Sequence, residues 1–343
     1  MNLGITFDDV LLTPQYSDIK SRRDIDIGNT LSGSSKHYFK LPVISAPMDT
    51  VTEASMARSM DEMGGLGIIH RYNTIEKQVD ILKQVKLSNS AHRVGAAIGI
   101  TGDFLERAVA LYHNGVDVLC LDVAHGHHIS TKAALEKLCA LYKGHVHIMA
   151  GNVATLEAFN DLSDWGADSI RVGIGGGSIC STRIQTGHGV PTLQSVIDCS
   201  MTDRSAMLIA DGGLKTSGDI VKALAAGADF VMLGSLLAGT TEAPGEFLNR
   251  PTPSSRGVKV YRGMASEEAQ KDWRGKANSL EGISTTIPYK GAVRNVLHKL
   301  DKGIRSGFSY SGARNLTELQ TKARFIRQTN SSRLESSTHI LAN

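Results

Sequence analysis

A glycine-rich segment that ends in a cysteine is the part of this sequence best equipped for chemistry. Residues 171–183 have the sequence RVGIGGGSICSTR, in which an apolar strand pattern leads into glycines, Ser178 and Cys180. Consecutive glycines expose backbone N–H groups that can hold a phosphate, and a cysteine thiolate can attack an electrophilic carbon. A free cysteine is more often a small buried hydrophobic residue. Position alone therefore leaves two hypotheses for Cys180, a nucleophile or a core residue.

Glycines and polar groups also follow two later apolar runs. One run ends in Asp211-Gly212-Gly213 and the next in Gly234-Ser235. In many barrels a phosphate lies at the loops after strands seven and eight, and an aspartate beside it could bind the hydroxyls of a ribose. Two glycine turns and an exposed aspartate explain the same residues without a ligand, so both interpretations stay open.

The other potential ligands and thiols have simpler explanations. Asp122 is followed by His125 and His127, but such a strand-end cluster is more often hydrogen-bonded structure than a metal site. No cysteine has CxxC or CxxH spacing, and four cysteines are too few for a disulfide framework in 343 residues, in agreement with a reducing cytoplasm. The cysteines expected to be structural are Cys120, Cys139 and Cys199.

Eight short apolar runs position these groups. Helical patterns such as TIEKQVDILKQV and GDIVKALAAG lie between them, with apolar residues at i, i+3/i+4 and i+7. Buried strands alternating with amphipathic helices indicate a parallel sheet, and eight such units favour a closed (β/α)8 TIM barrel with its chemistry at the strands' carboxyl ends. The predicted strands are residues 41–46, 65–70, 94–100, 117–123, 146–151, 167–173, 206–213 and 228–234.

Three segments fall outside the barrel in a chain that we predict to be one domain, residues 1–343. Residues 1–40 precede the first strand. Residues 250–292 are rich in Gly, Ser and charge and show little periodicity, so we expect a mobile flap that acts as a lid or binding loop. The tail 325–343 is polar and serine-rich, and we expect it to be mobile in isolation.

Composition restricts the partners. The net charge of +3 is small and spread along the chain, which argues against nucleic acid or a membrane surface as a partner. There is no apolar run of about 18 residues, and the first residues, MNLGITFDDVLLTP, lack the pattern of a signal peptide. We therefore expect a globular cytoplasmic protein.

The order of motifs along the chain resembles the IMP dehydrogenase/GMP reductase family. The resemblance covers nearly the whole chain and implies a TIM barrel, a purine mononucleotide substrate, an NAD(P) cofactor and a homotetramer. It rests on TFDDVLLTP (6–14), SAPMDTVTE (45–53), GLGIIHR (65–71), RVGAAIG (93–99), GIGGGSICSTR (173–183), ADGG (210–213), SGDIVKALAAGADFVMLGSLLAGTTEAPGE (217–246), YRGM (261–264), PYKG (288–291) and GIRSG (303–307).

The resemblance implies chemical roles for four side chains. Cys180 would form a covalent adduct with C2 of the purine. Thr182 and Glu281 match the threonine and the flap acid of a proton-transfer pair, and Asp122 would face the nicotinamide of the cofactor.

Binding roles follow from the same resemblance. Donors for the 5′-phosphate would be Ser178, Gly213, Gly234, Ser235 and Tyr261. Asp211 would bind the ribose hydroxyls. The base would lie against Ser45, Met48, Gly263 and Met264. The loop that holds a monovalent cation such as K⁺ would contribute the backbone carbonyls of Gly175, Gly177 and Cys180.

Two reactions share the covalent adduct in this family. A dehydrogenase transfers hydride from IMP to NAD⁺ and hydrolyses the adduct to XMP, whereas a reductase expels ammonia from GMP and uses NADPH to give IMP. Dehydrogenases activate the water with an Arg–Tyr pair on a long flap. Here the flap from Met264 to Pro288 is short, contains Asp272-Trp273-Arg274 and has no tyrosine. Loss of a general base typically costs about 10²–10⁴-fold, which favours the reductase.

Other features are mixed. Reductases usually have a lysine where this chain has Arg71, which does not readily release a proton, and Asn-Gly where it has His125-Gly126. Gly176 replaces the usual proline, which we expect to loosen the loop. Only LSNSAHR separates the second helix from the third strand, so the regulatory CBS domain of many dehydrogenases is absent. We predict a GMP reductase that uses NADPH. The alternatives are an IMP dehydrogenase that uses NAD⁺ and a non-catalytic nucleotide-binding regulatory protein.

Overall fold

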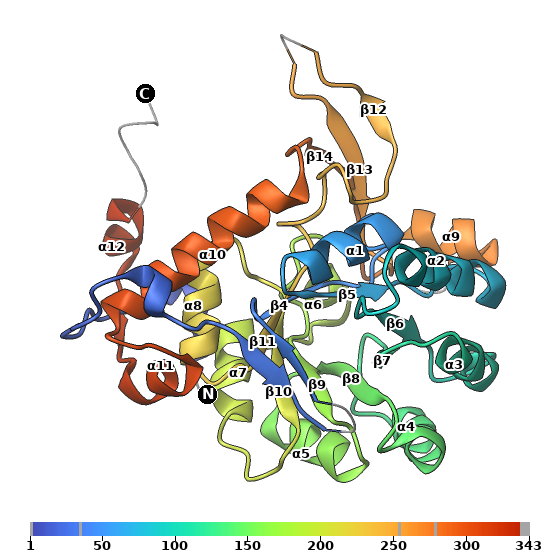
Figure 1. The fold of residues 1–343 in the computed structure, drawn as a ribbon, viewed down its shortest axis with the longest axis horizontal. Helices are drawn as coiled ribbons and strands as arrows, with labels where there is room; N and C mark the ends of the chain where they lie inside the picture. Colours follow the sequence, from blue (N-terminus) through green and yellow to red (C-terminus); the bar gives the residue numbers. More distant parts are fainter. Residues whose placement is uncertain (1–2, 34–35, 253–254, 278–279, 337–343) are drawn as a thin grey trace.

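Eight parallel strands close into a barrel at the centre of the molecule (Figure 1). The computed structural model describes residues 3–33, 36–252, 255–277 and 280–336. The strands follow one another around the barrel in chain order, as predicted from the eight apolar runs, so the predicted fold is confirmed. They are β4 (Val43–Ser45), β5 (Leu66–Ile69), β6 (Gly95–Ile98), β7 (Val118–Asp122), β8 (His147–Val153), β9 (Ser169–Val172), β10 (Met207–Asp211) and β11 (Phe230–Leu233).

Helices surround the barrel; each barrel strand from β4 to β10 is followed by a helix before the next barrel strand begins, and α10 comes after β14 (Ser284–Pro288). They are α1 (Ala54–Glu62), α2 (Ile75–Ser88), α3 (Phe104–His113), α4 (Ile129–Tyr142), α5 (Leu156–Asp164), α7 (Thr192–Cys199), α8 (Ser217–Ala225) and α10 (Val293–Tyr310). The long helix α10 packs so closely on α8 that a Cβ on Gly303 would lie 2.2 Å from the Ser217 hydroxyl. Glycine at this position therefore allows the two helices to close the ring.

A hairpin fills the amino-terminal end of the barrel. It consists of β2 (Asn29–Leu31) and β3 (His37–Phe39), which pair antiparallel. Leu31 and Phe39 are buried in the barrel interior, where the Phe39 ring meets the Phe230 ring edge-on at 6.1 Å. This end is closed by apolar side chains, so a ligand must enter from the carboxyl ends of the strands.

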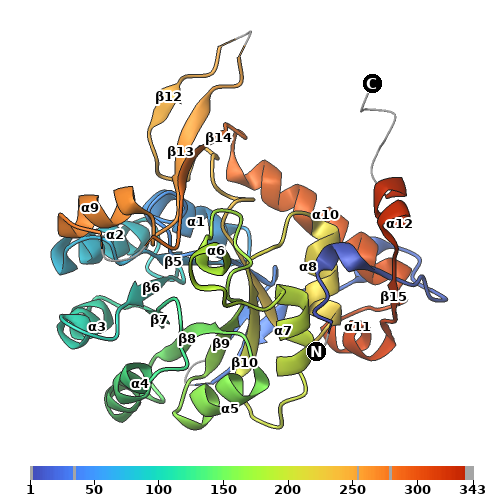
Figure 2. The ribbon, with the colours of Figure 1, turned by 180° about the vertical axis from the view of Figure 1, so that it is seen from behind.

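The segment expected to be an irregular lid contains regular structure. Strands β12 (Phe247–Asn249), β13 (Val258–Arg262) and β14 (Ser284–Pro288) form an antiparallel sheet, and α9 (Glu267–Arg274) lies between the last two. Figure 2 shows β12 and β13 projecting beyond the barrel, with α9 beside α2. The expectation of little periodicity was wrong, because β13 alternates buried and half-buried residues along its length.

The start of the polar tail forms regular structure with the N-terminal segment. Strand β15 (Phe325–Arg327) pairs antiparallel with β1 (Val10–Leu12), and α12 (Asn330–Glu335) follows. The backbone ladder to the N-terminal segment supplies the order that the polar side chains do not. The last part of the predicted tail, residues 337–343, lies outside the described residues.

Short elements complete the chain. They are η1 (Phe7–Asp9), η2 (Arg22–Asp24), α6 (Thr182–Thr186) and α11 (Leu316–Lys322). Within the described ranges, no helix combines the length and the apolar character that a membrane span requires.

Candidate active site

The carboxyl ends of the barrel strands surround a cavity of about 420 Å³, a size typical of small-molecule sites. Loops after β4, β5, β7, β9, β10 and β11 contribute to its wall, together with Asn152 of β8, β13, α9 and the segment before β14. The predicted site residues that line it are Met48, Asp122, Gly175, Gly177, Ser178, Cys180, Thr182, Asp211, Gly213, Gly234, Ser235, Tyr261, Gly263, Met264 and Glu281.

Ser45 is the predicted residue that the structure does not bring to the cavity. It is fully buried at the end of β4, and its hydroxyl accepts a hydrogen bond from Thr52 Oγ1 at 2.8 Å. The motif places Ser45 near the base, but its side chain packs behind the wall. Ala46, Pro47 and Met48 line the cavity in its place.

The cysteine loop leaves β9 along a path that requires glycine. Gly173 has a φ of +147°, and a Cβ there would lie 1.9 Å from the carbonyl oxygen of Asp211. The loop then brings Cys180 to the cavity with its Sγ 3.1 Å from Thr182 Oγ1. The thiol and the hydroxyl are therefore adjacent, as the resemblance implies.

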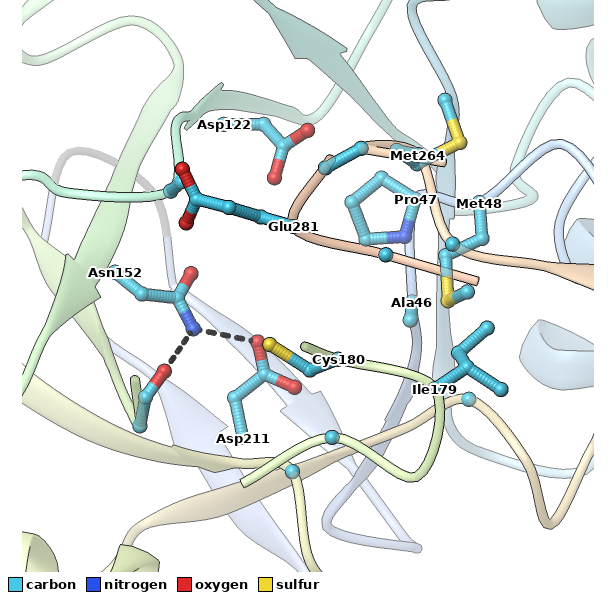
Figure 3. A pocket seen from close by; sticks show the side chains of 18 of the residues that line it. Ala46, Pro47, Met48, Asp122, Asn152, Ile179, Cys180, Asp211, Met264 and Glu281 are labelled. Atoms are coloured by element: carbon cyan, nitrogen blue, oxygen red, sulfur yellow. Dashed lines mark hydrogen bonds between the residues drawn. The ribbon is translucent and has the colours of Figure 1, made fainter. Parts of the chain in front are cut away.

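The flap is joined to this loop by backbone hydrogen bonds. Ser181 N donates to Glu281 O at 2.9 Å, and Ile283 N donates to Ile179 O at 3.0 Å. Cys180 and Gly282 thus form an antiparallel bridge. Figure 3 shows the Glu281 carboxylate and the Cys180 thiol entering the same cavity from these two segments.

A buried arginine joins two carboxylates at the base of the cavity. Arg171 in β9 donates from Nη1 to Asp122 Oδ1 at 2.6 Å and from Nη2 to Asp211 Oδ2 at 2.9 Å. Asn152 Nδ2 donates to the same Asp211 oxygen at 2.9 Å (Figure 3). Burial disfavours the guanidinium charge, but Asp211 and Asp122 outweigh this effect and raise the pKa of Arg171. Both carboxylates are therefore fixed by a permanent cation.

Hydroxyls and glycines gather at the end of the cavity that the loops after β9, β10 and β11 form with β13. Ser178 Oγ lies 3.3 Å from Tyr261 OH, and burial raises the pKa of Tyr261, so its hydroxyl stays a donor. Gly213 has a φ of +78° that favours glycine. Lys290, which is not among the residues that line the cavity, donates from its ammonium to the carbonyl of Ser235, and burial lowers the pKa of Lys290 to about 8. This end has the donors that a phosphate requires.

An aromatic and cationic cluster covers the side of the cavity next to Asp122. The Trp273 ring on α9 stacks on Tyr72 with centroids 4.2 Å apart and 14° between the planes. The guanidinium of Arg274 lies 4.0 Å from the Trp273 centroid. Arg71, Tyr72 and Arg274 all line the cavity, so this cluster closes the site where the resemblance places the cofactor.

Two places were considered for a metal ion, the Asp122–His127 cluster and the cysteine loop, and their surroundings differ. Asp122 binds Arg171 while His127 binds Asp161 at 2.8 Å, and no group of three or more metal-ligating side chains occurs among residues 3–33, 36–252, 255–277 and 280–336. In the cysteine loop Gly177 O already accepts a hydrogen bond from Cys180 N. The Arg183 side chain packs against Gly175, so a cation there would face a guanidinium.

Sequence reasoning gave no role to Arg171, Asn152 or Tyr72. A charged residue within the apolar run that contains Arg171 was a usable signal, because a buried charge needs partners. Asn152 and Tyr72 carried no such signal, since their neighbours become known only when the strands are placed around the barrel.

The fold and this cavity define a class: a (β/α)8 barrel with a ligand site at the strands' carboxyl ends that combines a thiol, paired carboxylates and a glycine-rich phosphate-type end. Within that class, the chain belongs to the IMP dehydrogenase/GMP reductase family, whose domain model matches residues 4–339. The family is one of NAD(P)-dependent purine nucleotide oxidoreductases.

Similar proteins carry both enzyme names. The inosine-5′-monophosphate dehydrogenase of Cryptosporidium parvum is 38% identical and covers 98% of this chain and 95% of its own length. The GMP reductase of Leishmania major is 31% identical over 99% of this chain and 97% of its own length. A solved structure of a GMP reductase variant from Trypanosoma brucei in complex with guanosine 5′-monophosphate has a TM-score of 0.91 at 29% identity, over 99% of this chain and 98% of that one.

Proposed function

We propose that this chain is a GMP reductase that converts GMP to IMP and ammonia with NADPH. The observation that carries the proposal is the flap between Met264 and Pro288, which has no tyrosine in its sequence. Over the cavity it presents Glu281, Gln270 and Arg274. A flap without the Arg–Tyr pair leaves the covalent adduct without the base that would activate water.

The proposed reaction centres on Cys180. Its thiolate adds to C2 of the guanine, the bond from C2 to the amino nitrogen breaks, and ammonia leaves with a proton. Thr182 Oγ1 is 3.1 Å from the sulfur and, with Glu281, supplies that proton. Hydride then adds to C2, the carbon–sulfur bond breaks, and Cys180 leaves as a thiolate with IMP. NADPH, when bound, supplies the hydride.

The remaining groups hold the nucleotide in this proposal. No described residue donates to Oδ1 of Asp211, while Oδ2 is occupied by Asn152 and Arg171, so Oδ1 is free for ribose hydroxyls. Ser178, Tyr261 and the glycine turns hold the 5′-phosphate. Met48 and Met264 flank the base, and Asp122 faces the nicotinamide.

One observation favours an IMP dehydrogenase as the second candidate. Tyr72 and Arg274 both line the cavity, so an arginine and a tyrosine are present there even though they come from different segments. Such a pair could activate water without a tyrosine on the flap.

The test is absorbance at 340 nm in two reactions, GMP with NADPH and IMP with NAD⁺ plus K⁺. Loss of absorbance with release of ammonia and IMP supports the reductase. A sustained gain with formation of XMP would instead support the dehydrogenase and mean that another residue, for which Arg274 is the candidate, activates water. No turnover in either reaction would support the non-catalytic hypothesis. Repeating both assays with Na⁺ replacing K⁺ tests the proposed cation loop.

We also propose that the chain acts as one catalytic domain in a cytoplasmic homotetramer. Helix α2 ends at Ser88 and β6 begins at Gly95, and Lys86 Nζ donates to His92 O across this connection. A regulatory module inserted there would have to displace that contact. Light scattering on the purified protein measures the assembly.

A further inference from the structure

A second cavity adjoins the phosphate end of the active-site cavity. Its volume is about 260 Å³. The two cavities share Ser178, Gly213, Leu214 and Ser235. Three of these four residues, Ser178, Gly213 and Ser235, are among those proposed to hold the 5′-phosphate, so the second cavity begins where that phosphate would lie.

The amino terminus of α7 forms one wall of this second cavity. Pro191, the residue that caps the helix, supplies no side-chain hydrogen bond. Within the described ranges, no hydrogen bond uses the backbone N–H groups of Thr192 and Leu193 at the start of the helix. Free N–H groups at the positive end of a helix favour an anion.

A buried hydroxyl without a partner lies beside that helix end. Thr192 is 5% exposed, and its Oγ1 has no hydrogen-bond partner among the described residues. It faces Gly176, where a Cβ would lie only 2.2 Å away. Any side chain at this position would clash with Thr192, so glycine in place of the proline expected from the resemblance leaves space at this wall. An unpaired buried donor costs free energy until a ligand supplies an acceptor.

The charged side chains around the cavity leave an excess positive charge. Arg183 and Lys215 line it, and Asp8 is the one acidic residue in its described lining. Asp8 pairs with Lys215 at 2.7 Å. Arg183 donates to the carbonyl of Val190 at 2.7 Å and has no carboxylate partner among the described residues. Its guanidinium is therefore available to an anion.

We propose that this cavity binds a second phosphate group, so that a purine nucleoside 5′-diphosphate occupies both cavities at once. The base and the first phosphate take the active-site cavity, and the second phosphate meets the α7 amino terminus, Arg183 and Lys215. The inference rests on the proposed mononucleotide site. It extends that site to nucleotides longer than the proposed substrate.

The test compares GMP and GDP binding by calorimetry without cofactor. In Arg183→Gln, which keeps most of the side-chain stem against Gly175, we expect GDP to bind at least tenfold more weakly and GMP to change less than threefold. Lys215→Met should act in the same direction without touching the cysteine loop. Lys137→Met, at an exposed position on α4, is the matched control and should change the affinity for neither GMP nor GDP.

Thr192→Val separates recognition from folding. Because the hydroxyl has no partner in the free protein, valine should not lower the melting temperature. It should nevertheless weaken GDP binding about threefold. Equal losses for GMP and GDP in Arg183→Gln and Lys215→Met, or no loss for either, would overturn the proposal. Binding is measured without turnover, so failure of the reductase assay would leave this result standing.

Inorganic phosphate distinguishes the source of the second phosphate. Inorganic phosphate is titrated into protein saturated with GMP. If it binds, and if this binding disappears in Lys215→Met, the cavity is a site for free phosphate. Tight GDP binding without such a phosphate signal would assign it to the diphosphate.

Discussion

At the scale of single residues, the structure separates the thiol of Cys180 from three thiols whose pKa is raised by burial. Burial raises the pKa of Cys120 and of Cys199 to about 12. Burial also raises the pKa of Cys139, whose sulfur contacts the carbonyl of Gly166 at 3.4 Å. Cys180 instead lines the open cavity beside Thr182. Because the thiolate is the reactive form, these surroundings assign different reactivities to identical side chains.

We therefore predict one fast-reacting thiol per chain. At pH 7.5 a disulfide reagent such as dithionitrobenzoate should modify Cys180 at least tenfold faster than the other cysteines, and saturating GMP should slow the reaction. The released chromophore gives both rate and stoichiometry. Cys180→Ala should remove the fast phase and abolish turnover while GMP binding persists. Two or more fast thiols in the native protein would contradict the prediction.

The chemistry-bearing residues were partly predictable from the sequence for a physical reason. Asp211 ends an apolar strand pattern, Cys180 follows one after a glycine-rich loop, and the carboxyl ends of parallel strands meet at one face. Arg171 in β9 reaches Asp211 on the neighbouring strand β10 and Asp122 on β7, two strands away in the barrel, and these aspartates are 40 and 49 residues away in the chain. The side chain of Ser45 turns away from the cavity, which a strand-end motif does not specify.

At the scale of elements, the flap is fixed at both of its ends. Strand β13 pairs with β14 along its whole length, and the segment before β14 joins the cysteine loop. Between them, Arg262 on β13 bridges Asp49 after β4 and Asp272 on α9. The Trp273–Tyr72 stack then holds α9 against the loop after β5.

Loss of this stack should weaken the closed flap. A stacked aromatic pair contributes about 0.5–1.5 kcal/mol beyond burial, so we predict that Trp273→Ala lowers kcat/KM by about 2–12-fold in the active direction. Trp273→Phe keeps a ring on Tyr72 and should recover most of the loss. Steady-state kinetics with varied cofactor measure the effect, and unchanged kcat/KM in Trp273→Ala would show that the stack does not hold the flap.

Strands β14 and β15, which the sequence did not predict, have partners that are distant in the chain. Strand β15 has three residues and pairs with β1, more than 300 positions away. Strand β14 pairs with β13 across the whole flap. Barrel strands are backed by a local alternation with helices, whereas these short strands depend on long-range backbone pairing that leaves little local pattern.

At the scale of the whole molecule, the barrel divides chemistry from stability. The carboxyl ends of the strands carry the cavity, while the amino ends are closed by Leu31 and Phe39. Asp229 lies at this closed end, immediately before β11, and its Oδ2 accepts a hydrogen bond from Leu208 N at 2.8 Å. Burial raises the pKa of Asp229 to about 6. A change there should affect unfolding and leave the distant chemistry intact.

The sign of the pH dependence follows from that raised pKa. The unfolded carboxyl has a pKa near 3.9, so the folded state binds the proton more tightly. The contribution of Asp229 to the free energy of unfolding is therefore fully present below about pH 4, falls as pH rises to about 6, and is level above it. Asp229→Asn keeps an acceptor for Leu208 N and removes the charge. We predict that Asp229→Asn raises the free energy of unfolding at pH 8 by at most about 3 kcal/mol and flattens its dependence on pH between pH 4 and 6. The gain should fall short of this limit because the carboxylate is partly exposed.

Urea unfolding at several pH values measures this effect, with Asp80→Asn on the exposed face of α2 as the control. The prediction would be contradicted if Asp229→Asn were less stable than the wild type at pH 8 and its stability still fell between pH 4 and 6. That result would mean that the hydrogen bond from Leu208 N stabilises the fold more than the buried charge of Asp229 destabilises it.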